Sequence, residues 1–509
     1  MIQTVENIGE KLVSMLTYDA SQPLIFSSGL FLFLFAGFLF FYGFTRRAPM
    51  ARIVYVILFS LYFYYKSSGI YFLLLVFASV SDYWIAHAIY KVRTQRAKYW
   101  LVGLSVLVNL GMLGYFKYTN FLIEIANNLF GQGFLNFQNI FLPVGISFFV
   151  FQSMSYTIDI CRGQLKPLNN WADYLFYLSF FPQLVAGPIV RAKDFIPQIR
   201  QNPLRVTREM FGMGVFLILI GLFKKAVISD YISLNFVDRI FDEPLLYSGF
   251  ECLMGIYGYA LQIYCDFSGY SDMAIGIALL LGFRFPKNFD APYKSATITE
   301  FWRRWHISLS TWLRDYLYIS LGGNRKGRIR TYFNLLVTML LGGLWHGAAR
   351  RPIPWGASVR FILWGALHGI ALALHKLWLS VVPGSKATGA EMRWFWRIPG
   401  IFFTFNLVCF GWLMFRAESM KTVQLMLHQI FTNFNPSVIP QVLEGYAGIF
   451  LLVGIGYLLH MLPDRCDRWA QRFVTSLPTV VQVLLAACVI WLVMQVKSSD
   501  IQPFIYFQF

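Results

Sequence analysis

The chain has 509 residues, of which 57% are hydrophobic, 18% are aromatic and only 13% are charged. Soluble domains carry about 25% charged residues, so this composition excludes an ordinary soluble enzyme and predicts a membrane protein. The net charge of +18 does not indicate nucleic-acid binding, because the basic residues gather in short loops between apolar runs, as the positive-inside rule predicts.

The N-terminal 23 residues contain Glu6, Glu10, Lys11 and Asp19 and no long apolar core. They therefore do not have the pattern of a secretory signal peptide, and we expect residues 1–23 to form an interfacial segment. Placing the basic loops in the cytoplasm leaves the N-terminus outside it.

Apolar runs follow along the rest of the chain, and a membrane span needs roughly 20 apolar residues. The sequence predicts an all-α polytopic membrane protein with about 11–12 transmembrane helices. The runs fall at 24–44, 52–65 with 69–90, 99–114, 140–160, 209–230, 248–282, 331–348, 359–378, 395–415, 446–462 and 479–496.

Two further apolar segments are not continuous spans. Pro182 and Pro188 break any single helix over 171–191, since proline lacks a backbone N–H. The second segment, 301–322, places Arg303 and other charged residues among regularly spaced aromatic residues. Broken helices at membrane depth occur where they line a cavity or are buried in protein, so both segments are predicted to be re-entrant or interfacial.

The densest polar region of the sequence runs from 264 to 323. Residues four apart on a helix share a face, so His306 is expected to lie on one face with Trp302 and Ser310. Glu300 and Arg304 have the same spacing, and Glu300 is expected to form an ion pair with Arg303 or Arg304 that anchors this helix. The candidates for a substrate channel are Asp266, Ser268, Asp272, Trp302, Arg304, Ser310 and Trp345.

Two histidines in strongly apolar surroundings are the candidate catalytic residues, His306 in EFWRRWHIS and His346 in LLGGLWHGA. Ionisable groups at membrane depth are costly and mark substrate paths or reaction centres. Histidine accepts a proton near neutral pH with little tuning. The small residues beside His346 permit close approach by another backbone or a ligand. A third histidine, His368 in LWGALHG, is interpreted as structural.

The chemistry open to such a histidine is general-base catalysis. It can remove a proton from a hydroxyl as that hydroxyl attacks an activated acyl carbon, commonly a thioester. The sequence has no GxSxG elbow, P-loop or HExxH motif, so catalysis would depend on the histidines. We expect no metal site and no bound cofactor, and no single residue can be named as the oxyanion donor.

These motifs resemble the membrane-bound O-acyltransferase (MBOAT) family, and its alginate O-acetyltransferase-like bacterial branch in particular. The matching segments are LPVGISFFVFQSMSYTIDICRG, FFPQLVAGPIVR, YCDFSGYSDMAIG, NFDAPYKSATITEFWRRWHISLSTWLRDYLYISLGGNR and GGLWHG. The resemblance implies transmembrane helices around a funnel or tunnel. It also implies acyl transfer from a cytoplasmic thioester donor, with the family histidine at His346 and the branch's second histidine at His306.

The resemblance also implies three parts of the chain: the interfacial segment 1–23, a catalytic core at 24–378, and helices at 379–509 that complete the bundle. The sequence departs from the family pattern at ARRPIPWGA (349–357), which intervenes before SVRFILWGALHG. This insertion leaves open the placement of His346 relative to His368.

The expected function is transfer of an acyl group, most simply acetyl, to a hydroxyl for modification of an extracytoplasmic polysaccharide at the bacterial inner membrane. The expected donor is acetyl-CoA or an acyl carrier protein, with Arg325 and Lys326 at its entrance. The resemblance also implies an extracytoplasmic hydrolase-like partner. Three alternatives stay open: a D-alanyl transferase of teichoic acids, a polysaccharide or lipid-carrier transporter, and a non-catalytic membrane scaffold.

Overall fold

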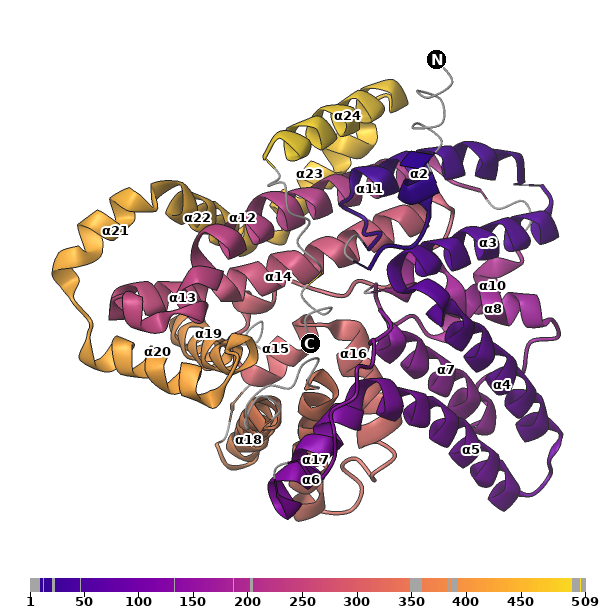
Figure 1. Cartoon of the computed structure of the whole chain (residues 1–509), viewed down its shortest axis with the longest axis horizontal. Helices are drawn as coiled ribbons and strands as arrows, with labels where there is room; N and C mark the ends of the chain where they lie inside the picture. Colours follow the sequence, from indigo (N-terminus) through magenta and orange to yellow (C-terminus); the bar gives the residue numbers. More distant parts are fainter. Residues whose placement is uncertain are drawn as a thin grey trace.

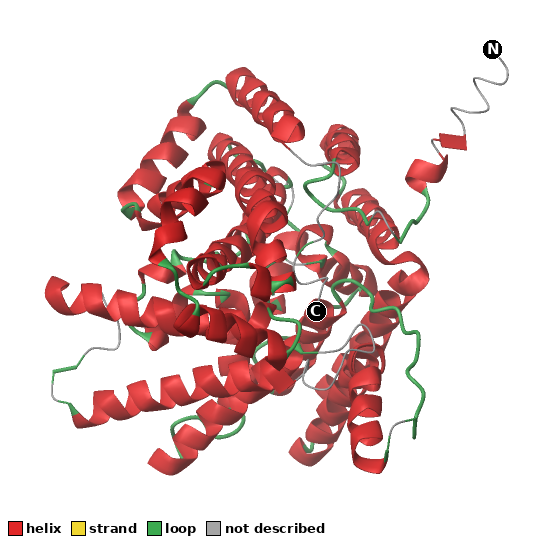
Figure 2. Cartoon of the chain, turned by 60° about the vertical axis from the view of Figure 1, so that its left-hand side comes forward, coloured by secondary structure: helices red, strands yellow, loops and turns green. Residues whose placement is uncertain are grey.

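The computed structural model describes residues 10–496 apart from short gaps, together with Phe504. The gaps fall at 12, 21–22, 46, 132, 186, 202–204, 348–358, 383 and 386–391. Every regular element in this described part is helical, and Figure 2 shows helices joined by loops. The predicted all-α class is confirmed. The N-terminal segment 1–23 lies largely, and the insertion 349–357 entirely, outside the described residues.

The first helices of the chain gather mainly on the right of Figure 1. They are α2 (Gly29–Tyr42), α3 (Pro49–Ser68), α4 (Phe72–Lys91), α5 (Gln95–Leu113), α6 (Thr119–Phe130), α7 (Ile146–Cys161), α8 (Trp171–Ser179), α9 (Phe181–Leu184) and α10 (Ala192–Ile199). Short 3-10 turns lie between some of them, η1 (Gly43–Thr45) and η2 (Gly69–Tyr71), and a π-helical turn, η3 (Gly114–Tyr118), joins α5 to α6.

The middle of the chain supplies the centre of the molecule (Figure 1). Its α-helices are α11 (Arg208–Leu222), α12 (Asp230–Ile232), α13 (Asp238–Asp242), α14 (Gly249–Leu280), α15 (Ile298–Arg304), α16 (Ile307–Trp312), α17 (Arg328–His346) and α18 (Val359–Val381). Three π-helical segments interrupt them, η4 (Phe223–Ser229), η5 (Ser233–Val237) and η8 (Leu313–Tyr318), and two 3-10 turns, η6 (Pro244–Leu246) and η7 (Pro292–Lys294), flank α14.

The C-terminal third continues the helical assembly. It contains α19 (Trp394–Arg416), α20 (Met420–Thr432), the 3-10 turn η10 (Pro436–Val438), α21 (Ile439–Gly445), α22 (Ala447–Met461), α23 (Asp464–Ser476) and α24 (Thr479–Val496). In Figure 1, α19 to α22 lie on the left, and α23 and α24 lie above α11.

Five helical segments of the described chain are long and apolar enough to cross a membrane, or up to seven if each of two sharply bent helix pairs counts as one span. This is fewer than the apolar runs of the sequence, because some runs form helices shorter than a bilayer: α2 has 14 residues and α7 has 16. The protein is nevertheless a multi-pass membrane protein. The five segments are Pro49–Lys91, Gln95–Phe130, Arg208–Asp242, Val359–Val381 and Trp394–Arg416.

Glycines allow the two central helices, α11 and α14, to pack closely. A Cβ atom on Gly221 would lie 2.5 Å from the carbonyl oxygen of Gly269, and one on Gly276 would lie 2.6 Å from that of Gly214. Small residues at such crossings let helix backbones approach in membrane proteins. The glycines of the YCDFSGYSDMAIG motif thus serve helix packing, which fixes the position of α14 beside the histidines.

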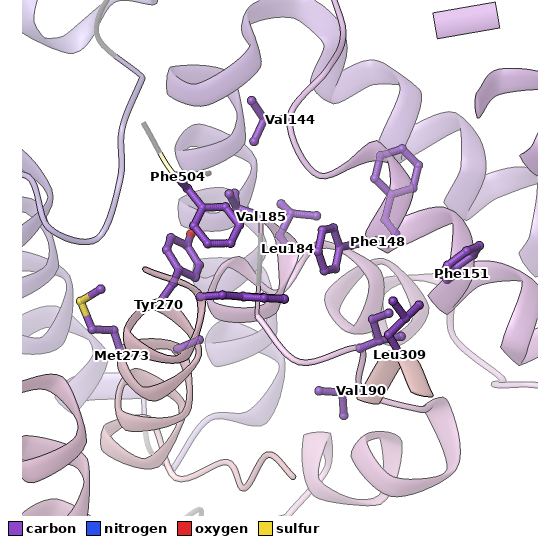
Figure 3. Close-up of a cluster of buried hydrophobic side chains, with 14 of the residues drawn as sticks. Val144, Phe148, Phe151, Leu184, Val185, Val190, Tyr270, Met273, Leu309 and Phe504 are labelled. Carbon is purple, nitrogen blue, oxygen red and sulfur yellow. The ribbon is translucent and has the colours of Figure 1, made fainter. Parts of the chain in front are cut away.

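Both segments that were predicted to be broken are broken. Helix α8 ends at Ser179, and the next helix, α9, begins at Phe181 with Pro182 in its first turn. In the second segment, α15 ends at Arg304 and α16 begins at Ile307. Side chains from these breaks join a buried apolar cluster, part of which Figure 3 shows around Leu184, Phe148 and Tyr270.

Candidate active site

His306 lies in the break between α15 and α16, where the backbone is left-handed. Its φ is 43° and its ψ is 56°, a conformation that residues other than glycine rarely adopt. The ring is almost completely buried, with 1% of the residue exposed. Strained backbone held by surrounding packing is typical of functional sites.

The break between α15 and α16 shows that the predicted environment of His306 is wrong. Because the helix is interrupted, Trp302, His306 and Ser310 do not share one helical face. Ser310 instead donates a hydrogen bond of 3.1 Å to the carbonyl oxygen of Trp305. The polar neighbour of the His306 ring is Asn288, whose Oδ1 lies 3.2 Å from His306 Nδ1. The expected ion pair in α15 is confirmed, with 3.0 Å between Arg304 Nη2 and Glu300 Oε1.

His346 is the last residue of α17, and 5% of it is exposed. Three aromatic side chains surround its ring: Trp345, with the ring centroids 4.7 Å apart, Phe415 of α19 at 5.2 Å and Trp364 of α18 at 5.4 Å. Trp364 in turn packs on His368 at 4.8 Å. His346 and His368 therefore both contact the ring of Trp364, which decides the relative placement that the insertion left open.

The prediction of close backbone approach beside His346 is confirmed. A Cβ atom on Gly343 would collide with the carbonyl oxygen of Phe361, and one on Gly365 would collide with that of Met339. The two glycines thus let α17 and α18 touch one turn before His346. The approach is made by backbone of this chain and leaves no room for a ligand at that point.

The two candidate histidines lie in one aromatic enclosure. Both rings are buried, with 1% of His306 and 5% of His346 exposed. Phe148 of α7 connects their surroundings, since its ring centroid lies 6.5 Å from that of His306 and 6.0 Å from that of Trp345. In Figure 3 the Phe148 side chain extends from the ribbon between Leu184 and Phe151. Water-poor, aromatic surroundings strengthen any electrostatic effect of these rings on a reacting group.

Buried cations bind the ends of the two helices that converge on His346. Lys117, in η3, donates a hydrogen bond of 2.6 Å to the carbonyl oxygen of Trp345. Arg360 of α18 donates one of 2.6 Å to the carbonyl oxygen of Phe415, near the end of α19. The last carbonyls of a helix have no partner within it, and cations are favourable there. Both helix ends are thus fixed beside the imidazole.

A ladder of aromatic rings leads from His346 towards a basic cluster. The centroid distances are 4.7 Å from His346 to Trp345, 5.3 Å from Trp345 to Phe151, 4.1 Å from Phe151 to Trp312 and 5.2 Å from Trp312 to Tyr316. The ladder ends at Tyr316, which lies in η8. This π-helical segment precedes the basic loop that leads to α17.

The guanidinium groups of Arg162 and Arg191 lie over the Tyr316 ring, 5.3 and 5.5 Å from its centroid. Arg191 also forms an ion pair of 2.7 Å with Asp315. Burial alone would raise the pKa of Asp315, but hydrogen bonds from Arg314 and Arg191 hold it below its ordinary value. The carboxylate therefore remains charged and orders the arginines at the outer end of the ladder.

The carboxylates that were predicted as substrate-channel candidates form ion pairs with lysines of η4. Asp266 Oδ1 lies 2.6 Å from Lys225 Nζ, and Asp272 Oδ2 lies 2.7 Å from Lys224 Nζ. These pairs join α14 to the end of α11. Ser268 is buried in α14 between them.

The other predicted residues divide between the enclosure and its margin. Trp302 packs on Trp364 and His368, and Trp345 contacts His346 directly. Arg304 bridges Glu300 and Asp290. Arg325 and Lys326 lie in the exposed loop before α17.

Five residues that belong to this site were absent from the sequence-based prediction: Asn288, Lys117, Arg360, Trp412 and Phe415. Lys117 and Arg360 could have been found from the sequence, because a charge in an apolar run is costly without a partner. Trp412 and Phe415 could not have been found in this way, since the sequence of α19 carries no motif. Trp412 packs on Trp305, with 4.8 Å between ring centroids.

Comparison with known proteins matches the model of the MBOAT, membrane-bound O-acyltransferase family to residues 164–420, which include both histidines. A probable alginate O-acetylase AlgI from Azotobacter vinelandii is 43% identical over 80% of this chain and 78% of its own. The chain belongs to the membrane-bound O-acyltransferase family. Its resemblance to the alginate O-acetylase branch is confirmed, and it is an O-acyltransferase.

Relatives with other acceptors are also similar to this MBOAT protein. The peptidoglycan O-acetyltransferase of Helicobacter pylori is 36% identical over 79% of each chain. The teichoic acid D-alanyltransferase of Streptococcus thermophilus is 31% identical over 64% of this chain and 77% of its own. The names of these relatives all describe transfer of an acyl group, acetyl in the first two and D-alanyl in the third.

Proposed function

We propose that this MBOAT protein transfers an acetyl group from a cytoplasmic thioester donor to a hydroxyl used in modification of an extracytoplasmic polysaccharide. The observation that carries the proposal is the shared enclosure of His306 and His346, in which both imidazoles are buried among aromatic rings and Phe148 connects their surroundings. A transporter or scaffold would not require two histidines held in this way. The similarity to alginate O-acetylases favours acetyl as the group transferred.

In the proposed reaction His346 is the general base. Its imidazole takes the proton of the acceptor hydroxyl as that oxygen forms a bond to the thioester carbonyl carbon. The tetrahedral intermediate then expels the thiolate, which takes up a proton, and the acyl group remains as an ester on the oxygen. His306 faces the same enclosure and assists proton transfer. Such help contributes roughly 10²- to 10⁴-fold to the rate.

The donor approaches from the basic side of the molecule. Acetyl-CoA and acyl carrier proteins are both anionic. The loop that carries Arg325 and Lys326 is exposed and follows η8, which contains Tyr316. The aromatic ladder through Trp312 and Phe151 connects this basic side to His346 by packed side chains. The basic loops are proposed to face the cytoplasm of a bacterial inner membrane, with the N-terminus outside.

The acceptor side requires a partner. We propose that the acetyl group passes to a protein with an extracytoplasmic hydrolase-like domain, which completes transfer to the polysaccharide. D-alanyl transfer is the second candidate, because a D-alanyltransferase is also similar to this chain. The lower identity and coverage of that relative favour acetyl transfer.

The test measures ester-linked acetate and D-alanine on envelope polysaccharides from bacteria that lack the native gene and express either wild type or a variant. His346→Ala should lower acylation at least about a hundredfold, the low end of general-base help. The control is His428→Ala, an exposed histidine on α20, which should acylate normally. Near-normal acylation by well-expressed His346→Ala would contradict the proposal, and D-alanine in place of acetate would support the second candidate.

A further inference from the structure

Asn288 holds the backbone and side chains around His306 through one amide group. It lies in the loop between α14 and α15. Its Oδ1 lies 3.2 Å from the backbone nitrogen of Ser308, 2.9 Å from the Ser308 hydroxyl and 3.2 Å from His306 Nδ1. Its Nδ2 donates to the hydroxyl of Ser271 on α14 at 3.1 Å. The backbone carbonyl of Asn288 also accepts the N–H of Ile307 at 2.8 Å.

These contacts decide the orientation of the amide. Oxygen and nitrogen of an asparagine side chain are assigned from the hydrogen-bond network. A backbone N–H can only donate, so the Asn288 atom that faces Ser308 must be the oxygen. Rotating the amide would place its NH₂ against that N–H and leave two donors facing each other in a buried site, which is costly.

The amide orientation in turn decides the state of the histidine. An amide oxygen can only accept, so His306 Nδ1 must carry the proton that lies between them. The Ser308 hydroxyl lies farther from His306 Nδ1, at 3.5 Å, and its proton is engaged because it donates to Asn288 while accepting the N–H of Ile189 at 3.0 Å. In a neutral imidazole only one nitrogen is protonated, so Nε2 carries the lone pair.

We propose that Asn288 is the positioning residue of this enzyme: it fixes His306 as the Nδ1–H tautomer and thereby makes Nε2 the atom that exchanges protons with substrate. The proposal rests on the proposed acyl transfer only for the use of Nε2. The tautomer itself follows from the hydrogen bonds. The left-handed backbone of His306 fits this role, since the Ile307 N–H to Asn288 bond holds the turn that brings the ring to the amide.

The experiment is ¹⁵N NMR of the full-length protein labelled at its seven histidines, with His306→Gln used to identify the His306 signals. In wild type, Nδ1 should have a pyrrole-type and Nε2 a pyridine-type chemical shift. In Asn288→Ala, the His306 ring should lose this preference and populate both tautomers. Asn288→Asp retains an acceptor at the same place and should restore the Nδ1–H form.

Kinetics provide the second measurement. Asn288→Ala should lower kcat about ten- to a hundredfold with KM changed by less than about threefold, by analogy with the loss seen when the hydrogen-bond partners of metal-bound histidines are removed. Asn120→Ala is the matched control, because Asn120 is also buried and anchors the loop backbone at Gln138 through two hydrogen bonds. It should alter neither the His306 signals nor kcat of the folded protein.

Three outcomes separate the possibilities. A single Nδ1–H form in Asn288→Ala overturns the proposal, even if activity falls, because the asparagine would then be merely structural. Loss of the tautomer in Asn288→Ala with recovery in Asn288→Asp supports it. The NMR result does not depend on turnover, so a protein inactive with acetyl donors would refute the proposed function and leave the assignment of Asn288 intact.

Discussion

Lys117 and Trp345 are joined by a hydrogen bond of 2.6 Å between the lysine Nζ and the tryptophan carbonyl oxygen, although 228 residues separate them in the sequence. The adjacent Tyr118 donates to the preceding carbonyl, that of Leu344, at 3.0 Å. Two consecutive residues of a π-helical turn therefore bind the last carbonyls before His346. π-helical turns are frequent at functional sites, and this one fixes the end of the helix that carries the proposed base.

Replacing Lys117 by Met should destabilise the protein by about 2 kcal/mol, since hydrogen bonds to charged groups are worth about 1.5–3 kcal/mol. Acyl transfer per folded molecule should also fall, because the end of α17 is released. Tyr118→Phe removes a neutral hydrogen bond of the same helix end and should cost about 1 kcal/mol. Thermal unfolding in detergent and acyl-transfer assays measure both effects. Equal stability of Lys117→Met and wild type would contradict this account.

Gly343→Ala should destabilise the contact between α17 and α18 by at least about 1–3 kcal/mol, the usual cost of overpacking. The added methyl group would meet the backbone of Phe361, which cannot move aside as a side chain can. Gly342→Ala is the matched control, because its methyl group would meet only a Leu313 side-chain carbon at 3.5 Å. That neighbouring change should be neutral or slightly stabilising through helix propensity. A similar loss in unfolding temperature for both variants would show that backbone contact is not the cause.

The segment 301–322 should not cross the bilayer. Arg303 and Arg325 lie before and after most of it and are both exposed. In a protein whose native cysteines are replaced, Arg303→Cys and Arg325→Cys should react with a membrane-impermeant maleimide from the same, cytoplasmic side. Labelling in intact cells and in inverted vesicles distinguishes the sides. Reaction from opposite sides would make this segment a span, despite its broken helix.

Reversing the charges of Arg325 and Lys326 to Glu should lower kcat/KM for an anionic donor about tenfold at low salt, because electrostatic steering raises encounter rates by 10- to 10³-fold. The difference should shrink as salt increases, since screening weakens steering. Reversal of Arg465 and Arg468, which are exposed on α23, is the control. Side-specific labelling must show unchanged topology. If the topology is unchanged and the charge-reversed variant depends on donor concentration as wild type does at low salt, the loop only orients the helices in the membrane.

The sequence alone determined the class of protein and indicated His346 as the candidate general base. Apolar runs, broken segments and the glycines before His346 are local patterns, and each reflects a local cost: unpaired backbone groups in lipid or a Cβ atom at a helix crossing. The ion pair of Glu300 with Arg304 was predictable for the same reason, since four residues of one helix bring the two groups together.

Only the tertiary structure decided what surrounds the histidines. Helical spacing placed His306 beside Ser310, but a left-handed residue breaks the helix and turns the ring to Asn288. Asp266, a substrate-channel candidate, forms an ion pair with Lys225, because a buried carboxylate is stable only beside a cation or several donors. Trp345 receives the ammonium of Lys117, which lies far away in the sequence. Such pairings depend on how distant helices pack, and no local spacing encodes them.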